Sequence, residues 1–231
     1  MSTSQPLAAT TEPSKADRVY YFLRRRIREL QIPPGTALRK NEIAVECGVS
    51  RAPVSEAIAR LASEGLVDVY PQNGSFVAPI RPEDIQEALF LRMALEVEGV
   101  KALTRMRDQQ VLEQLGENIE AQATALGAKK LDVATYDDLD ASFHSLIISA
   151  IHSPRTQSVL DTARAILDRP RFAAVPVKDR PHETFDEHRR IHDAIRTGDP
   201  DLAGSAMRVH IMAVSDAIDR KLKQITNTDD T

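Results

Sequence analysis

Two glycines bracket a short helical pattern in the N-terminal third of the chain, and this arrangement limits what the segment can fold into. After Gly48, Ser50 occupies a position typical of a helix N-cap, and Gly65 supplies a C-terminal stop. Between them, apolar side chains recur at intervals of three and four residues, the spacing of one helix face. That inner face consists of Val54, Ala57, Ile58 and Leu61. The segment is therefore expected to be a short helix with one buried face.

Two further helices precede this one, and two short strands follow it. Apolar spacing predicts a first helix that ends before the sequence Pro33-Pro34-Gly35. A second helix, with Asn41 as candidate N-cap, ends at Gly48. Residues 66–70 and 75–78 have the composition of strands joined by a turn in the sequence Pro-Gln-Asn-Gly. Two helices joined by a tight turn, with a two-stranded flap behind them, form a winged helix-turn-helix.

The third predicted helix presents groups that suit DNA. With the apolar face turned inward, Arg51 and Ser55 lie on the opposite face, one turn apart. Such a helix fits the major groove, which is about 12 Å wide, and its N-terminal residues meet the base edges. The helix N-terminus and the Ser50 hydroxyl suit a phosphate. Arg51 is a candidate either for contacting a guanine or for holding the backbone, unless the segment is an ordinary three-helix core with a solvated arginine.

The net charge of −4 is unevenly distributed along the chain. Residues 15–80 hold ten Lys/Arg and seven Asp/Glu, whereas the remainder holds twenty Lys/Arg and twenty-seven Asp/Glu. Because charges beyond a Debye length of about 8 Å are screened, the local charge decides whether phosphate is attracted. The basic segment can therefore bind nucleic acid although the whole chain is acidic.

Composition favours a mainly helical protein of two domains. Hydrophobic residues make up 42% of the chain, aromatic residues only 4%, and tryptophan is absent. A proline-marked junction at 79–84 separates a winged helix-turn-helix domain (15–80) from an all-helical bundle (81–225), with a disordered tail at 1–14 and a flexible tail at 226–231. A loop with three prolines is expected at 169–183. The helices of the bundle are expected at 83–106, 108–126, 132–152, 155–168, 183–197 and 199–223.

The expected location is the cytoplasm, without a membrane anchor. Cys47 is the single cysteine, so an intrachain disulfide is impossible and a reducing compartment is favoured. No apolar run approaches the roughly 18 residues that a bilayer span requires. The first residues lack the basic start and apolar stretch of a secretory signal.

All six histidines lie beyond residue 143, which suggests a metal site. Asp140 and His144 are one helical turn apart, as are His188 and His192, and His210 lies on the last predicted helix. Three imidazoles and a carboxylate suit Zn, Ni, Mn or Fe. Spacing alone does not choose between His188 and His192. It also leaves open that each histidine is simply solvated or part of the core.

The N-terminal segment resembles the DNA-binding domain of GntR-family bacterial transcription regulators. The resemblance covers roughly residues 18–78, in the sequences IPPGTALRKNEIAVECGVSRAPVSEAIARLASEGLV and NGSFV. It implies that the recognition helix opens at Ser50 and that Asn73 and Gly74 form the tip of the wing. Ser55 stands where the family often has arginine, and Asn41 where a charged residue is common. The implied DNA-binding residues are Asn41, Ser50, Arg51, Ala52, Ser55, Asn73 and Gly74.

The second segment, about 85–215, is similar to the all-helical FCD effector domain of FadR-type members of that family. The matching sequences are LRMALEVEGVKAL, DASFHSLI, EHRRIHDAI and AMRVHI. The resemblance excludes His192, where the family has an apolar or aromatic residue, and it implies that Arg92 and Arg164 help to hold a carboxylate metabolite. Arg92 is alternatively expected to pair with Glu96 on the surface. The implied metal ligands are Asp140, His144, His188 and His210.

Together these features predict a homodimeric transcription regulator rather than an enzyme. Each protomer would contact one half of a palindromic operator, the helical domain would dimerise through 85–106, and a small organic acid bound at a divalent metal would control repression. One alternative is a metal-dependent hydrolase or isomerase fused to a DNA-binding module, and another is a structural metal with no effector. A dedicated catalytic base is not evident, because Glu187 and Asp193 flank the ligands but are expected to face solvent.

Overall fold

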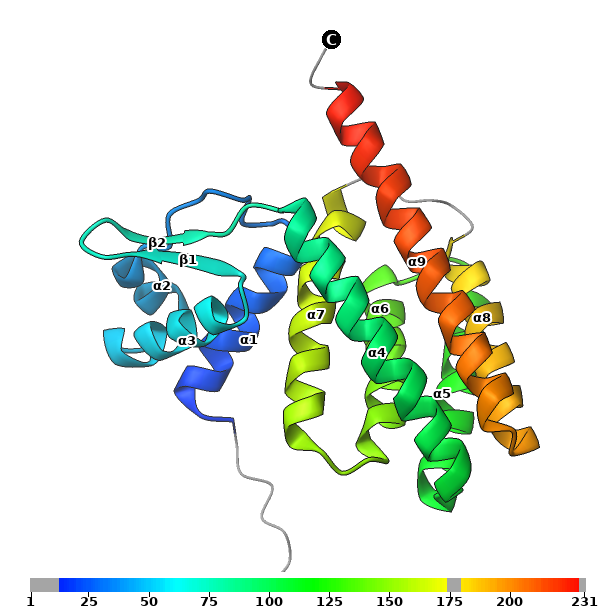
Figure 1. Cartoon of the computed structure of the whole chain (residues 1–231). Coiled ribbons are helices and arrows are strands. Elements are labelled where there is room, and N and C mark those ends of the chain that lie inside the picture. Colours follow the sequence, from blue (N-terminus) through cyan, green and yellow to red (C-terminus); the bar gives the residue numbers. More distant parts are fainter. Residues whose placement is uncertain (1–12, 174–179, 229–231) are drawn as a thin grey trace, which may run out of the picture. The chain divides into compact units, whose positions relative to one another are not determined.

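The protein, seen here as a computed structural model, is described at residues 13–173 and 180–228, and the chain divides into two compact units, Met1–Pro79 and Ile80–Thr231 (Figure 1). The described residues form nine helices and one two-stranded sheet. The predicted mainly helical class, with a winged helix-turn-helix followed by a helical bundle, is confirmed.

The N-terminal unit contains three helices and a hairpin. Gly48 ends the second helix with φ +64°, a left-handed conformation that glycine adopts without strain. The two strands are antiparallel, with Val67 opposite Val77 and Tyr70 opposite Gly74. The elements are α1 (Lys15–Arg28), α2 (Lys40–Cys47), α3 (Arg51–Ser63), β1 (Val67–Tyr70) and β2 (Gly74–Val77).

The core of this unit lies where α1 packs against α3. Leu23 and Ile27 of α1 are completely buried, and the predicted inner face of α3 is buried along its length. Full burial of such side chains stabilises the fold by about 1.5–3 kcal/mol each. The apolar spacing therefore identified the correct face of α3, and this leaves Arg51 exposed at the start of that helix.

Three details at the helix ends differ from the sequence-based expectations. Arg39, not Asn41, is the N-cap of α2, so Asn41 lies inside the first turn. Ser50 is the N-cap of α3, as predicted, but its side chain makes no capping hydrogen bond. Ser14, assigned to the disordered tail, caps α1 in a reciprocal hydrogen-bonded pair with Asp17. Residues 1–12 of that predicted tail lie outside the described residues.

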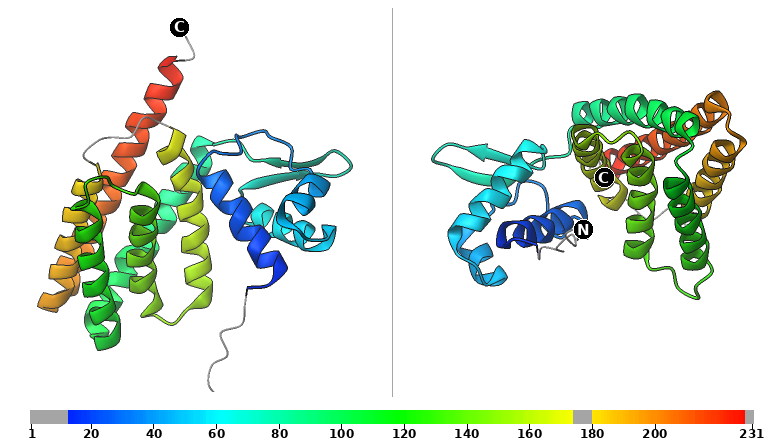
Figure 2. Two further views of the ribbon diagram at one scale, coloured as in Figure 1. Left: turned by 180° about the vertical axis from the view of Figure 1, so that it is seen from behind. Right: turned by 90° about the horizontal axis from the view of Figure 1, so that it is seen from below.

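The C-terminal unit is a bundle of six helices. α4 packs against α6, α7 and α9, while α5 packs against α6 and α8 (Figure 2). Gly99 lets α4 approach α6 closely, because a Cβ atom there would lie 2.6 Å from Ile148 Cδ1. The helices are α4 (Pro82–Met106), α5 (Gln109–Leu126), α6 (Val133–Ser149), α7 (Pro154–Ala173), α8 (Arg180–Thr197) and α9 (Pro200–Thr228).

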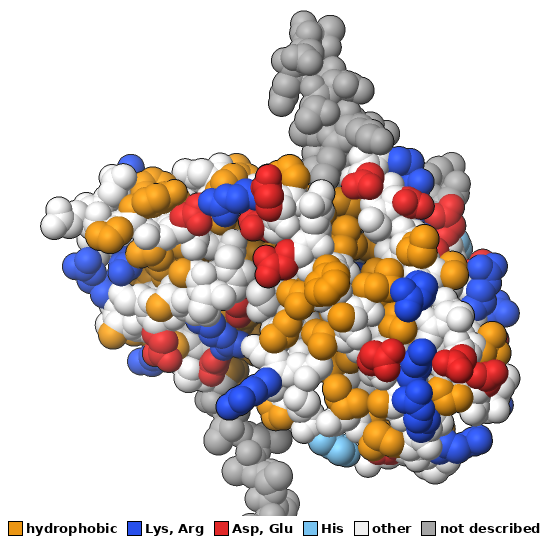
Figure 3. All heavy atoms as spheres, viewed as in Figure 1, with side chains coloured by type: hydrophobic (Ala, Val, Ile, Leu, Met, Phe, Trp, Pro, Cys, Tyr) orange, Lys and Arg blue, Asp and Glu red, His pale blue; other side chains and the backbone are white. Residues whose placement is uncertain are grey.

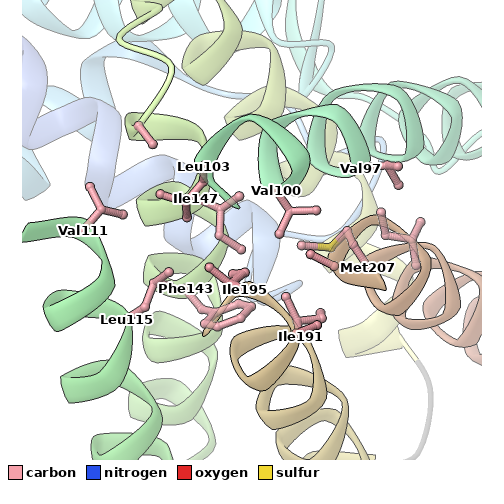
Figure 4. Packing of buried hydrophobic residues seen from close by; sticks show 14 residues of the cluster. Val97, Val100, Leu103, Val111, Leu115, Phe143, Ile147, Ile191, Ile195 and Met207 are labelled. Atoms are coloured by element: carbon pink, nitrogen blue, oxygen red, sulfur yellow. The ribbon is translucent and has the colours of Figure 1, made fainter. Parts of the chain in front are cut away.

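One hydrophobic cluster joins five of these helices (Figure 4). Its members include Leu103 of α4, Leu115 of α5 and Ile191 of α8, which are completely buried. Phe143 of α6 belongs to the same cluster and stacks on His188 of α8, with ring centroids 4.2 Å apart. The core thus directly supports the ring of one predicted metal ligand.

The predicted loop at 169–183 is largely wrong. α7 continues to Ala173 with Pro170 inside it, and α8 already begins at Arg180. Pro181 occupies the first turn of α8, where a proline is tolerated because no intrahelical partner exists for its missing N–H. Residues 174–179 lie outside the described residues. α9 also extends past its expected end to Thr228, and the last three residues of the predicted flexible tail are not described.

Within the described residues, none of the helices combines the length and the apolar composition that crossing a membrane requires.

Candidate functional site

A groove of about 760 Å³ lies in the N-terminal unit, between the start of α2, the start of α3 and the wing. Four of the seven predicted DNA-binding residues line it: Asn41, Arg51, Asn73 and Gly74. Gly74 has φ +114°, which favours glycine at this corner of the hairpin. The wing is stiffened by an edge-to-face contact between Tyr70 and Phe76, with ring centroids 5.9 Å apart.

The other three predicted residues do not line this groove, although they lie close to Arg51 along the chain. Ser50 and Ala52 are exposed at the start of α3, and Ser55 is half-buried. Because the first turn of α3 carries no acidic side chain, the positive end of the helix dipole is not neutralised locally.

The groove also contains two cations that the sequence analysis did not single out, Arg39 and Lys40. In the sequence, the two cations are visible as a consecutive Arg-Lys pair at the start of the second helix. The direction in which their side chains point depends on the residue at which that helix begins. Arg39 contacts Glu42 at 3.1 Å on the exposed surface, an interaction that contributes little to stability in water. With Arg51, three basic side chains therefore line the groove, which makes it suitable for the backbone of a nucleic acid.

In the C-terminal unit, three histidines from three helices converge. His144 of α6, His188 of α8 and His210 of α9 each offer one ring nitrogen, and these nitrogens all lie within 4.8 Å of one another. All three side chains are buried. The ring centroids are 4.9–5.2 Å apart.

Asp140 lies one helical turn before His144 and borders the same point. Its Oδ1 atom is 3.6 Å from His188 Nε2 and 4.0 Å from His144 Nε2. The structure therefore brings the four predicted ligands together. His192, which has the same spacing as His188 on α8, lies outside the cluster. It is half-buried, and its Nδ1 atom is 4.0 Å from the carboxylate of Asp193. His152 and His182 are exposed.

Burial keeps two of the clustered imidazoles, those of His144 and His188, uncharged. It lowers the pKa of His144 to about 4 and that of His188 well below its ordinary value. Both rings are therefore neutral at pH 7, the form that binds a metal. Among the described residues, the buried Nε2 atoms of His188 and His210 have no hydrogen-bond partner. Such atoms are rare in folded proteins unless an ion, a water or a ligand satisfies them, so the cluster fits a divalent cation.

Arg92 and Glu96 form a pair, but the expectation that it lies on the surface is wrong. Arg92 is 4% exposed and Glu96 is 0% exposed. Arg92 Nε donates to Glu96 Oε1 at 2.5 Å, and the same carboxylate contacts His144 Nδ1. Burial would raise the pKa of Glu96, but the charge of Arg92 and the hydrogen bonds from Arg92 and His144 hold it well below its ordinary range. The pair borders the histidine cluster, since Arg92 Nη2 is 3.4 Å from His144 Nε2.

Arg164 of α7 points into the bundle. It is buried, and its Nη2 atom donates to Asp140 Oδ2 at 2.7 Å. The two candidate effector-binding arginines therefore both lie next to the predicted metal ligands.

Glu187 does not face solvent, contrary to the expectation from its position beside His188. Its carboxylate bonds His210 Nδ1 and Arg180 Nη1, each at 2.7 Å. These hydrogen bonds outweigh the effect of partial burial and lower the pKa of Glu187. A carboxylate that accepts from a ligand imidazole orients the ring, an arrangement frequent around metals. Asp193, by contrast, is exposed as expected.

Models of two protein families match the chain. The family described as "Bacterial regulatory proteins, gntR family" matches residues 15–77, and the family described as "FCD domain" matches residues 87–213.

Curated relatives match over most of their length. A Streptomyces ambofaciens protein named as an uncharacterized HTH-type transcriptional regulator is 36% identical, over 93% of this chain and 89% of that protein. The HTH-type transcriptional repressor RspR of Escherichia coli K12 is 30% identical over 90% of each chain. The gluconate operon transcriptional repressor of Bacillus subtilis is 27% identical over 93% of this chain and 89% of its own. These relatives are named as regulators and not as enzymes.

Solved structures share the fold. Escherichia coli McbR/YncC aligns with a TM-score of 0.75 at 19% identity, over 90% of this chain and 99% of that one. A putative GntR regulator from Rhodococcus sp. RHA1 aligns with a TM-score of 0.70 at 23% identity, over 90% and 98%.

Proposed function

The chain belongs to the GntR family of bacterial regulatory proteins, with an FCD domain after its DNA-binding unit, and we propose that it is a repressor controlled by a small carboxylate held at a divalent metal. In this proposal the winged unit binds a palindromic operator in the cytoplasm, and two copies of the chain each contact one half-site. Effector binding acts through a difference in affinity between DNA-competent and DNA-incompetent arrangements.

The observation that carries this proposal is the composition of the histidine cluster and its walls. Asp140 and the three buried imidazoles would hold Zn, Ni, Mn or Fe as a divalent ion. Arg92 and Arg164 stand beside these ligands, and each guanidinium group is held there by a carboxylate, that of Glu96 or Asp140. A bound metal supplies positive charge, and the guanidinium groups add planar donors, so an organic acid is the favoured ligand class.

The direct test is operator binding with and without metal and effector. An operator is selected from random duplexes, and its affinity is measured by fluorescence anisotropy while a panel of small carboxylic acids is added to metal-loaded protein. The correct acid should change operator affinity by about 5–150-fold, the usual range of allosteric coupling. Failure of every acid to bind metal-loaded protein in calorimetry would contradict the effector proposal while leaving DNA binding intact.

Arg51→Ala is expected to weaken operator binding by about 1–3 kcal/mol, because it removes a base contact or a firmly held phosphate contact. Arg25→Ala is a matched control. Arg25 is exposed on α1, forms an ion pair with Glu29 and lies outside the groove. Anisotropy at one salt concentration should separate the two variants, and equal affinities would refute the placement of α3 in the major groove.

The protein is expected to dimerise mainly through its helical unit, with α4 in the interface. Hydrophobic side chains gather along α4 in Figure 3, and Phe90 on this helix is 71% exposed. A single winged unit contacts few base pairs, so high affinity needs two half-sites at fixed spacing. Sedimentation of the full chain at micromolar concentration should show a dimer, and Phe90→Asp should shift it toward monomer. A wild-type monomer would contradict this proposal.

A further inference from the structure

Gln122 of α5 is a fully buried amide that contacts one predicted metal ligand from outside the cluster. Its Oε1 atom lies 3.0 Å from His188 Nδ1. α5 contributes none of the four predicted ligands, so the contact was not visible in the spacing of the histidines. It joins positions 66 residues apart in the chain.

A chain of hydrogen bonds determines which end of the Gln122 amide faces His188. It starts at the backbone carbonyl of Leu139, which can only accept, and which receives Asn118 Nδ2 at 3.0 Å. Asn118 therefore turns its Oδ1 toward Gln122 and accepts from Gln122 Nε2 at 2.6 Å. The remaining atom of the Gln122 amide, its carbonyl oxygen, is the one directed at His188.

The neighbouring tyrosine does not disturb this order. The Tyr136 hydroxyl has one hydrogen, which it donates to the Pro181 carbonyl at 2.8 Å, while its distance to Gln122 Oε1 is 3.5 Å. Gln122 Oε1 thus remains an acceptor for the His188 ring.

An acceptor at Nδ1 decides the tautomer of a neutral imidazole. His188 must carry its proton on Nδ1 to donate to Gln122, which leaves a lone pair on Nε2. That Nε2 atom is buried, has no hydrogen-bond partner among the described residues, and lies 3.6 Å from Asp140 Oδ1. A metal ion can bind His188 only through this lone pair on Nε2. In the other tautomer Nε2 would carry the proton, and its N–H would point at the metal position.

We propose that Gln122 is a positioning residue that holds His188 as its Nδ1–H tautomer and so presents Nε2 to the metal; this rests on the metal site of the proposed function. His144 and His210 have carboxylates, Glu96 and Glu187, in the corresponding outer positions. At His188 the outer partner is instead the neutral amide of Gln122. The orientation of this amide is fixed by the Leu139 carbonyl through Asn118.

The first experiment tests the tautomer without metal. Full-length protein labelled with ¹⁵N at histidine is examined in its metal-free form by multiple-bond ¹H–¹⁵N correlation, which distinguishes the two tautomers. Wild type is expected to show Nδ1–H at His188. Gln122→Leu should shift His188 toward Nε2–H, whereas Gln122→Glu, which keeps an acceptor, should restore Nδ1–H. Tyr136→Phe is the matched control, since it removes a polar atom from the same network and should leave the tautomer unchanged.

The second experiment measures Zn²⁺ affinity of the same variants by competition with a chelator. Gln122→Leu is expected to bind about 10–100-fold more weakly, the usual effect of removing an outer hydrogen-bond partner, and Gln122→Glu to bind nearly as wild type. If Gln122→Leu does not fold, as judged by circular dichroism, Gln122→Met replaces it.

The outcomes separate the two proposals. Wild-type protein that binds no metal would overturn the proposed function, whatever the spectra show. Wild-type protein that binds metal, together with a folded Gln122→Leu that keeps the Nδ1–H tautomer and the wild-type affinity, would overturn the role of Gln122 alone.

Discussion

Replacing His188 by glutamine is expected to lower the affinity for divalent metal by more than about 100-fold, since loss of an outer partner alone costs about 10–100-fold. His192→Gln is expected to leave the affinity unchanged. Both histidines lie on α8, one turn apart, but only His188 joins the buried cluster with His144 and His210. The measurement is elemental analysis of purified protein, followed by chelator competition.

His192 is a stringent control because it has the same residue type, the same helix and nearly the same sequence context. It is half-buried, so its replacement changes little packing compared with His188. If the His192 variant loses the metal while the His188 variant keeps it, the predicted ligand set is wrong on α8.

Metal binding should also stabilise the fold. The ligands come from α6, α8 and α9, so they can meet at one ion only in the folded bundle. At a free metal concentration of about 100 times the dissociation constant, the gain is about 2.7 kcal/mol. For a chain of this size that corresponds to a rise in melting temperature of roughly 5–10 °C. Thermal unfolding after chelation and stepwise addition of metal would measure it; a melting temperature independent of metal would contradict the linkage.

Operator affinity is expected to fall by about three orders of magnitude between about 50 and 200 mM salt, although the protein is acidic overall. Arg39, Lys40 and Arg51 line the groove of each protomer, so a dimer would neutralise about six phosphates. With about 0.9 counterions released per phosphate, the logarithmic slope is about −5.

Substitution of Lys40 by alanine should make that slope less steep by about two for the dimer, because one cation is removed from each groove. Arg25→Ala, outside the groove, should leave the slope unchanged. Anisotropy titrations at four or five salt concentrations provide the slopes. A flat salt response of the wild type would show that the groove does not hold the phosphate backbone.

The sequence by itself determined the features that depend on short-range periodicity. The buried face of α3 followed from apolar spacing, and the turn at Gly48 from the need for a left-handed residue. The i, i+4 relation of Asp140 and His144 placed both side chains on one helix face. The choice of His188 over His192 came from the family resemblance, because the two are equivalent in spacing.

Only the tertiary structure decided what surrounds these residues. Glu187, next to His188 in sequence, bonds a ring on another helix, and Gln122 meets His188 across 66 positions. The Arg92–Glu96 pair was predictable as a contact, but its burial depends on how α4 packs against α6. Such partners are fixed by the close packing of whole helices, which local spacing does not encode. The sequence therefore specified which groups could bind DNA and metal, and the packing of α5, α8 and α9 determined which atoms of those groups meet.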